Sequence, residues 1–145
     1  MAVGRPTKYK KQLAAEICCA LGEGNSLVDI CAAENMPTRS TIYLWLAEHK
    51  EFSDMYARAR EEQADTLADE IVHIADTPML GVKKKTGKDG TEITEGDMIE
   101  HRRLRVDARK WVAAKLKPKK YGDTRENTMQ GPDGGALLVQ VIKPA

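Results

Sequence analysis

The feature that most constrains this chain of 145 residues is a run of 26 residues, 51–76, that is ended by Thr77 and Pro78. At ~1.5 Å per residue, the run predicts a single helix about 39 Å long. Its apolar side chains form two patches, at 52–59 and at 67–75, with a polar waist between them. A helix with two apolar patches bridges two packing units. We therefore expect a boundary between two modules near residue 62.

The residues before this run predict three short helices, over residues 8–21, 27–33 and 39–49. Each helix follows a residue whose side chain suits an N-cap, namely Thr7, Ser26 and Thr38. Two short helices joined by a turn of about four residues, after a preceding helix, are typical of a helix-turn-helix. We therefore predict a helix-turn-helix DNA-binding module over residues 1–62.

The third expected helix has two different faces. Ile42, Trp45 and Leu46 fall on one side at about 100° per residue and should pack on the first two helices. In a helix-turn-helix, the opposite face of this helix enters the major groove of DNA. We predict DNA contacts from that face and from the basic N-terminal residues: Arg5, Lys8, Lys10, Lys11, Thr38, Arg39, Ser40, Thr41, Tyr43 and Leu44. The alternative is a three-helix bundle that binds no DNA.

The net charge of +1 results from 23 basic and 22 acidic residues that are unevenly distributed. Residues 61–81 carry six acidic and no basic side chains, whereas residues 101–120 carry nine basic and one acidic. A balance near zero argues against a protein that coats nucleic acid by bulk charge. Because the two segments belong to consecutive helices that should be antiparallel, we expect them to pair, within or between subunits. A nucleic-acid surface on the basic segment is the alternative.

A second long helix is predicted over residues 98–117 and is stopped by Pro118. Between the two long helices, residues 77–96 form an excursion that contains Asp89 and Gly90, a pair that favours a hairpin turn. A hairpin this polar is marginal in water. We therefore expect a mobile loop rather than an arm that touches DNA, and we interpret residues 63–120 as a helical oligomerisation core.

The C-terminal segment, 121–145, contains two candidate strands, 124–130 and 136–142, around a glycine-rich turn. The second strand is apolar on nearly both faces, and an open apolar edge invites pairing with other chains. We expect a sheet or barrel assembled from several subunits, with disorder and aggregation as the alternative. The residues expected at subunit contacts are Leu67, Ile71, Ile74, Leu104, Trp111, Leu137, Val139 and Val141. The predicted fold class is mainly α, with a helix-turn-helix module, long central helices for oligomerisation and short C-terminal β strands.

No sequence pattern indicates catalysis, a metal site or a cofactor. The histidines share no motif, and Cys18, Cys19 and Cys31 lack Cys-x-x-Cys spacing, so we interpret the cysteines as small buried apolar residues. Residues 81–88 resemble a phosphate-binding loop, but five residues instead of four separate the glycines, and Asp89 stands where serine or threonine is needed. No apolar run reaches the ~18 residues that span a bilayer. We expect no enzymatic activity and no membrane contact.

Five motifs follow one another along the chain: residues 4–9 (Gly-Arg-Pro-Thr-Lys-Tyr), residues 36–46, Phe52 with Tyr56, residues 103–111 and residues 118–123. Together they resemble the small terminase subunit of tailed bacteriophages, in particular the helix-turn-helix type of podovirus-like headful packagers. The resemblance covers roughly residues 4–76 and 101–142.

The resemblance implies a non-enzymatic ring of about eight or more subunits that binds the packaging initiation site on concatemeric double-stranded viral DNA. It also implies that the ring recruits and regulates the large terminase subunit, which holds the ATPase and the nuclease. The expected location is the host cytoplasm and not the mature virion. A helix-turn-helix transcription regulator is the alternative function; such regulators are usually dimers, so an assembly of more than four subunits would favour packaging.

Overall fold

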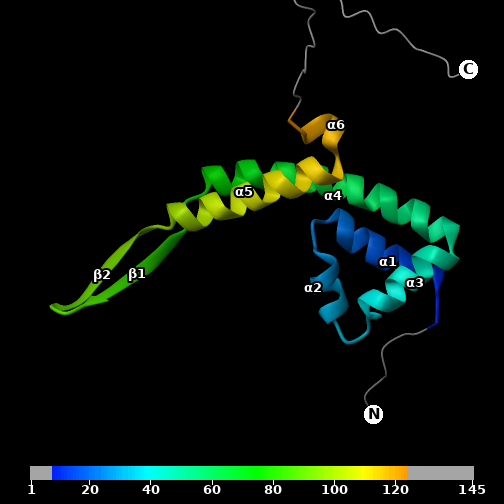
Figure 1. The fold of residues 1–145 in the computed structure, drawn as a ribbon, viewed down its shortest axis with the longest axis horizontal. Coiled ribbons are helices and arrows are strands. Elements are labelled where there is room, and N and C mark those ends of the chain that lie inside the picture. The colour runs from blue at the N-terminus through cyan, green and yellow to red at the C-terminus, as the bar shows by residue number, and fades with distance from the viewer. Residues whose placement is uncertain (1–7, 124–145) are drawn as a thin grey trace, which may run out of the picture.

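The computed structural model describes residues 8–123, which form two helical units joined by one long helix (Figure 1). In chain order the elements are α1 (Lys11–Gly22), α2 (Leu27–Ala32), α3 (Arg39–Glu48), α4 (Lys50–Asp76), β1 (Leu80–Gly87), β2 (Gly90–Asp97), α5 (Ile99–Leu116) and α6 (Pro118–Tyr121). Helices α1 to α3 pack on the first half of α4, and α5 packs on its second half. Within the described residues, no helix is long and apolar enough to cross a membrane.

Helices α1, α2 and α3 form the predicted helix-turn-helix around one apolar core that also includes the first half of α4. Ile17, Ile42 and Phe52 are fully buried in this core, and burial of each side chain contributes about 1.5–3 kcal/mol. Ser26 and Thr38 cap α2 and α3, as predicted, through side-chain oxygens that accept backbone N–H groups. The mainly helical fold class is therefore confirmed.

The start of α1 differs from the prediction, because the helix begins at Lys11 and not at Lys8. Lys10 is extended, with φ −136° and ψ 131°. This backbone lets the ring of Tyr9 stack on His49, with 3.7 Å between the ring centroids. A helix that began three residues earlier would turn Tyr9 away from this partner. The expected cap at residue 7 lies outside the described residues.

The polar waist of α4 holds the turn between α1 and α2. Gln63 is 3% exposed; its amide donates to the carbonyl oxygen of Asn25 (2.8 Å) and accepts from Arg60 (2.8 Å). The hydroxyl of Thr66 donates to the carbonyl oxygen of Gly22 (2.6 Å). Carbonyl groups at the end of a helix lack partners within that helix. The waist supplies a donor to the last carbonyl of α1 and another to a carbonyl of the loop that follows, and it thereby joins the helix-turn-helix to the long helix.

Helices α4 and α5 lie antiparallel, as predicted, and basic side chains of α5 and of the junction between α5 and α6 pair with acidic side chains of α4. Arg109 pairs with Glu70. Lys117 pairs with Asp65 at 2.9 Å. Ala113 of α5, which lies between Arg109 and Lys117 in the sequence, is buried. The basic segment thus pairs with the acidic segment within one subunit, as the sequence favours.

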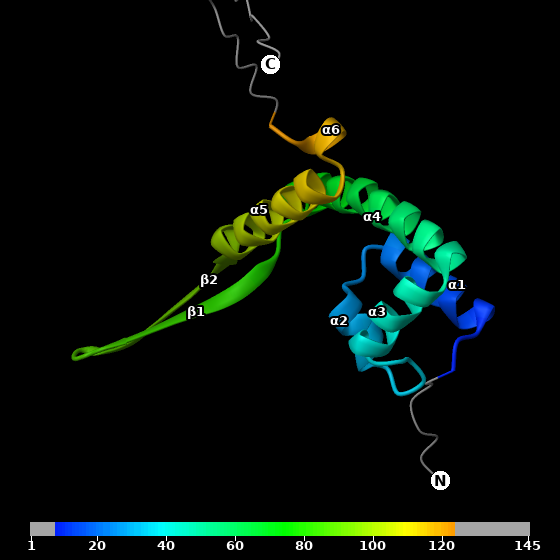
Figure 2. The same cartoon turned by 45° about the vertical axis from the view of Figure 1, so that its right-hand side comes forward.

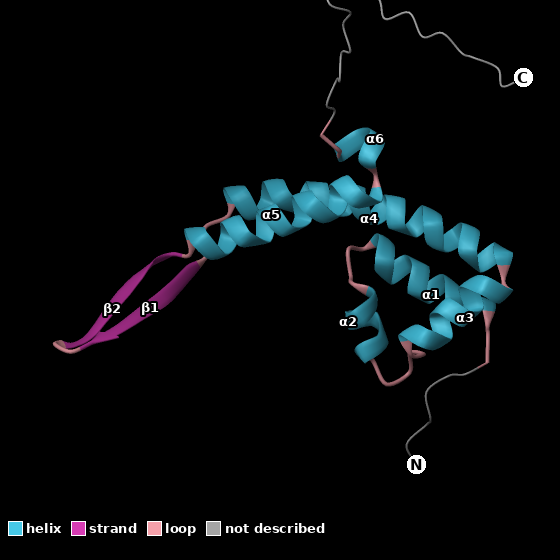
Figure 3. Ribbon diagram, viewed as in Figure 1, coloured by secondary structure: helices cyan, strands magenta, loops and turns pink. Residues whose placement is uncertain are grey.

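The segment between α4 and α5 is an antiparallel hairpin rather than the expected mobile loop (Figure 3). Gly87 pairs with Gly90 at the turn, where Gly90 has a φ of 122° that side chains with a Cβ disfavour. Arg102 fixes the base of the hairpin, because its guanidinium pairs with Asp97 and donates to the carbonyl oxygen of Ile74 (2.9 Å). This anchor joins the ends of α4, β2 and α5 and supports strands that would be marginal alone.

Asp65 holds α6 against α4. Its carboxylate accepts hydrogen bonds from Lys120 (2.8 Å), from the Tyr121 hydroxyl (2.6 Å) and from Lys117 (2.9 Å). These donors hold the pKa of Asp65 well below its ordinary value, and the same cluster raises the pKa of Lys120. The C-terminal strands that the sequence predicts lie outside the described residues.

The cysteines follow the prediction in part. Cys31 is buried and Cys18 is half-buried, and burial raises the pKa of the Cys18 thiol to about 11. The expectation is wrong for Cys19, which is exposed. Cys19 lies two residues after Ile17, so at about 100° per residue it falls on the opposite face of α1 from the core.

Replacing Gln63 with alanine should lower the free energy of unfolding by about 1–3 kcal/mol, because the buried side chain makes two hydrogen bonds, one to the carbonyl oxygen of Asn25 and one from Arg60, and each contributes about 0.5–1.5 kcal/mol. Gln12 provides a matched control, since it is exposed and bonds to Glu16 on the same face of α1. Gln12→Ala should change the free energy of unfolding by less than about 0.5 kcal/mol. Urea unfolding followed by circular dichroism measures both. Equal losses would contradict the structural role of the waist.

Replacing Asp65 with asparagine should release α6, because an amide does not form ion pairs with the two lysines. Trypsin should then cleave after Lys119 and Lys120 faster than in the unchanged chain, whereas Asp69→Asn, at another position on the same helix, should not alter the rate.

Folding lowers the pKa of Asp65, so its contribution is complete above the ordinary pKa of 3.8 and is lost as the pH falls below that value. If the contact between α6 and α4 in the unchanged chain were already lost near neutral pH, this role of Asp65 would be contradicted.

Candidate nucleic-acid interface

Helix α3 buries one face and exposes the other, as predicted. Ile42 and Trp45 are 0% and 2% exposed, whereas Tyr43 and Leu44 are each 56% exposed. The turn between α2 and α3 lies at the end of the module away from α4 (Figures 1 and 2). The outer face of α3 is therefore exposed, and no other described part of the module prevents this helix from entering a DNA groove.

Polar groups gather at the N-terminus of α3. The Thr38 hydroxyl oxygen accepts the backbone N–H of Thr41 (3.4 Å) and lies 3.0 Å from the hydroxyls of Thr41 and Ser40. Arg39 is exposed and forms no ion pair within residues 8–123. A helix N-terminus favours anions such as phosphate, through its free N–H groups and its dipole. The hydroxyls, the Arg39 guanidinium and the helix dipole thus all favour the binding of an anion at this end of α3.

Tyr9 ties the basic N-terminal segment to the other end of α3. Its ring stacks on His49 and meets the ring of Trp45 edge-on, with 5.5 Å between centroids. Lys8 and Lys10 flank Tyr9 and are both exposed. Positive side chains therefore lie near both ends of a helix about 15 Å long at ~1.5 Å per residue.

Two predicted DNA-binding residues have a different status. Lys11 pairs with Glu51 of α4 at 3.0 Å, and the hydrogen bond to this carboxylate raises the pKa of Lys11. The positive charge of Lys11 is therefore partly neutralised by an acidic neighbour. Arg5 lies outside the described residues.

A second exposed surface follows α5. Leu104 and Trp111, which the sequence predicts at subunit contacts, are each 66% exposed. They are seven residues apart and fall on one face of the helix. The Nζ atom of Lys115 lies 5.6 Å from the ring centroid of Trp111, a cation–π contact. Large apolar side chains exposed along one face are typical of a protein contact site.

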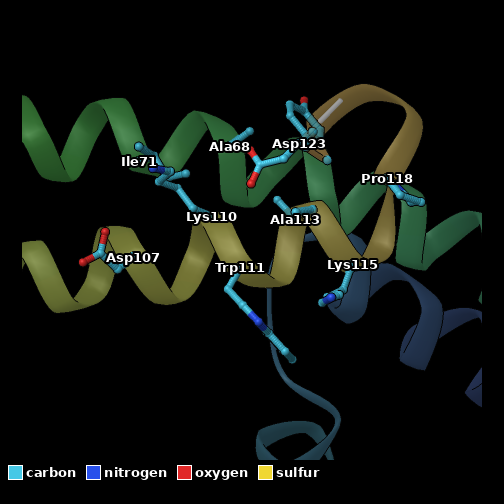
Figure 4. Close-up of a pocket in the computed structure, with 12 residues that line it drawn as sticks. Ala68, Ile71, Asp107, Lys110, Trp111, Ala113, Lys115, Pro118 and Asp123 are labelled. Carbon is cyan, nitrogen blue, oxygen red and sulfur yellow. The ribbon is translucent and has the colours of Figure 1, made fainter. Parts of the chain in front are cut away.

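An open pocket of about 840 Å³ lies next to this surface, between α4, α5 and α6 (Figure 4). Ala68 and Ile71 line its α4 side. In Figure 4, Lys110 reaches toward Ile71 while Trp111 points away from α4. The pocket therefore borders the Trp111 surface without enclosing it.

The remaining predicted contact residues divide into two groups. Leu67 and Ile74 are 8% and 4% exposed, so they pack within the subunit, and Ile71 is half-buried. The others lie outside the described residues: Leu137, Val139 and Val141. Of the described residues predicted at subunit contacts, Leu104 and Trp111 are thus the most available to a neighbour.

Two acidic side chains in the second half of α4 are used by the fold. Asp65 and Glu70 pair with basic residues that follow along α5 and α6. In the described part of the chain, no three histidine, cysteine, aspartate or glutamate side chains come together in a way that could hold a metal ion.

Three residues that position these surfaces are not predicted by the sequence patterns above. Gln63 could have been found, because it lies four residues from both Ala59 and Leu67 and so shares their buried face. Arg102 could have been suspected from an acidic residue five positions earlier. Tyr9 has no local signal, because its stacking partner is 40 residues away in the sequence.

Comparison with known proteins gives consistent results. A family model described as "Bacteriophage Sf6, terminase small subunit-like" matches residues 9–128. Three crystal structures of point variants of the terminase small subunit gp1 of the bacterial virus Sf6 each match with a TM-score of 0.68. Two are 36% identical, with 97% of each chain covered. The third is 37% identical and covers 94% of this chain and 100% of that chain. Among curated proteins, none matches.

The residues that the family model matches include the helix-turn-helix, the two long helices and the hairpin between them. The chain belongs to the Sf6-like family of terminase small subunits, which serve in bacteriophage DNA packaging.

Proposed function

We propose that this chain is the DNA-recognition subunit of a viral packaging machine. It binds the packaging initiation site on concatemeric double-stranded DNA as a homo-oligomeric ring of about eight or more subunits. The ring recruits the large terminase subunit and regulates its ATPase and nuclease, while the chain itself catalyses no reaction and needs no cofactor. It acts in the host cytoplasm and is absent from the mature virion.

The observation that carries this proposal is the exposed outer face of α3, with its polar N-terminus and the flanking lysines. Ser40 and Thr41 carry hydroxyls that suit base edges, and Leu44 suits the methyl group of a thymine. Arg39 and Lys10 contact phosphates. Phosphate contacts position the helix and base contacts supply specificity.

One module alone binds DNA weakly, because it offers few free positive groups. Affinity from counterion release scales with the number of phosphates neutralised, and Lys11 is already paired with Glu51. A ring presents many copies at high effective concentration, so avidity replaces strong single contacts.

The exposed apolar face of α5 supports assembly. A ring repeats one heterologous interface until it closes, and Leu104 with Trp111 offers an apolar face for such an interface. The same face would be a liability on a monomer, because large exposed apolar patches favour aggregation.

Replacing Arg39 and Lys10 with alanine should weaken DNA binding by the assembled protein about tenfold or more, and it should reduce the salt slope by about one for each phosphate that is no longer neutralised. Arg58→Ala with Lys119→Ala is the control, because both side chains are exposed, form no ion pair within residues 8–123 and lie outside α3 and the N-terminal segment. Titration of labelled duplex DNA at several salt concentrations measures both effects. If the control weakens binding equally, bulk charge and not α3 holds the DNA.

Replacing Trp111 with glutamate should leave the fold intact, because this side chain is 66% exposed, but should break the ring into small species. DNA affinity should then fall about a hundredfold or more through the loss of avidity. Native mass spectrometry gives the subunit number, and Val28→Glu, on a residue 59% exposed in α2, is the control for assembly. If the protein without substitutions is a dimer and still binds DNA tightly, the alternative function, a transcription regulator, is favoured.

A further inference from the structure

The two strands of the hairpin differ sharply in charge. Strand β1 carries a basic edge, which we define as Lys83, Lys84 and Lys85. Strand β2 carries an acidic edge, which we define as Glu92 and Glu95. Over the whole hairpin, four lysines are matched by four carboxylates: Asp89, Glu92, Glu95 and Asp97. The hairpin therefore has no net charge but a strong difference between its two sides.

Both outer edges of the hairpin are open within the described residues. The sheet has two strands, so each strand pairs on one side alone. All residues of β1 except Gly81, and all residues of β2 except Asp97, are exposed. An open strand edge presents unpaired N–H and C=O groups that can pair with another strand. The hairpin projects beyond the α4–α5 pair (Figures 1 and 2), so no other described element covers these edges.

One face of the hairpin also carries three apolar side chains. Val82 lies opposite Glu95 and Ile93 opposite Lys84, which places Leu80, Val82 and Ile93 on the same face because side chains alternate along a strand. Their exposed fractions are 83%, 50% and 60%. On the other face, Lys83 pairs with Glu100 of α5 at 2.9 Å. The face with these three apolar side chains is therefore open to a partner.

These features favour a second copy of this chain as the partner of the hairpin. DNA would need a net positive surface, because affinity for phosphates comes from uncompensated lysines and arginines, and here the acidic edge cancels the basic edge. In a head-to-tail ring, by contrast, each basic edge meets the acidic edge of the next subunit. Opposite charges directly across a strand pair contribute about 0.2–1 kcal/mol each.

We propose that the hairpins of adjacent subunits lie side by side, with the β1 edge of one copy along the β2 edge of the next. Repeated around the ring, this contact closes the hairpins into one antiparallel sheet without free edges. The inference rests on the proposed function, because it needs a ring of copies in head-to-tail order.

Charge reversal tests this arrangement. The basic edge is reversed by Lys84→Glu with Lys85→Glu, which leaves both edges of every hairpin acidic. The acidic edge is reversed by Glu92→Lys with Glu95→Lys, which leaves both edges basic. Each variant alone should dissociate at about tenfold higher protein concentration than the unchanged ring, because like-charge pairs replace opposite-charge pairs. The chain with all four substitutions should assemble normally.

Mixing the two reversed variants separates contacts between subunits from contacts within one hairpin. An acidic hairpin and a basic hairpin should alternate, so the mixture should assemble where each variant alone does not. Pairs within a hairpin, such as Lys85 opposite Glu92, stay repulsive in the mixture. Recovery on mixing therefore reports the neighbour, and native mass spectrometry reads the composition directly.

Cysteine cross-linking gives a second readout that does not depend on charge. The native cysteines are replaced by serine or alanine, and Lys84→Cys in one population is co-assembled with Ile93→Cys in another. A disulfide between the two populations is expected, and neither population alone should form one. Disulfides within the Lys84→Cys population would indicate that β1 meets β1, which contradicts the head-to-tail order.

The outcomes distinguish the two proposals. If the unchanged chain is a monomer, both the ring and the hairpin contact are wrong. If the ring forms and binds DNA, but charge reversal and cross-linking have no effect, the hairpin contact alone is wrong. If Lys84→Glu with Lys85→Glu lowers DNA affinity while ring stability stays unchanged, the hairpin is a DNA arm, and the contact between copies is overturned.

Discussion

The continuity of α4 is the constraint on which the rest of the structure depends. Its 27 residues form one helix with no break between the two units, and its buried positions form a single stripe: Phe52, Ala59, Gln63, Ala64, Leu67 and Ile74. Phe52 and Leu67 are fifteen residues apart. At about 100° per residue, their side chains therefore point in directions that differ by about 60° around the helix axis. Helix geometry therefore sets the angle between the helix-turn-helix module and α5, because one unbroken helix joins them.

Polar contacts stabilise the second unit, where α4 and α5 bury few apolar side chains. The helix-turn-helix has a full aromatic and aliphatic core, whereas the second unit buries few apolar side chains, among them Leu67, Ile74 and Ala113. Ion pairs and charged hydrogen bonds hold this second unit together, and Arg102 joins three elements at its far end. A unit that is held by polar contacts can leave its large apolar residues outside. Trp111 is exposed in this unit, so burial of its side chain is available to the assembly that we propose.

The sequence predicts those parts of the fold that local chemistry determines. Proline, glycine and capping residues place the helices within a few residues, and Ser26 and Thr38 cap as expected. The ordered hairpin is not predicted, because its strands are polar and the contacts that fix its base come from Arg102, which lies outside the strands. The start of α1 escapes it because Tyr9 and His49 are distant in the sequence and meet through tertiary packing. On α3, the periodicity identifies the outward face, but the pairing of Lys11 with Glu51 cannot be predicted from either residue alone.

A rigid α4 also has a consequence for how DNA is held in the proposed ring. Modules on stiff helices do not swing independently to follow a straight duplex, so several of them engage only where the duplex curves around the ring. Smooth bending of a 20–30 bp site by 40–90° costs about 1–6 kcal/mol, depending on the sequence bent. Each module with few free positive groups returns a small amount of binding free energy, so several modules must engage before the sum exceeds that cost. In the ring that we propose, recognition would therefore depend on DNA deformability as well as on base contacts of α3, and sequences that bend easily would be bound in preference to stiff ones with the same bases at the contact points.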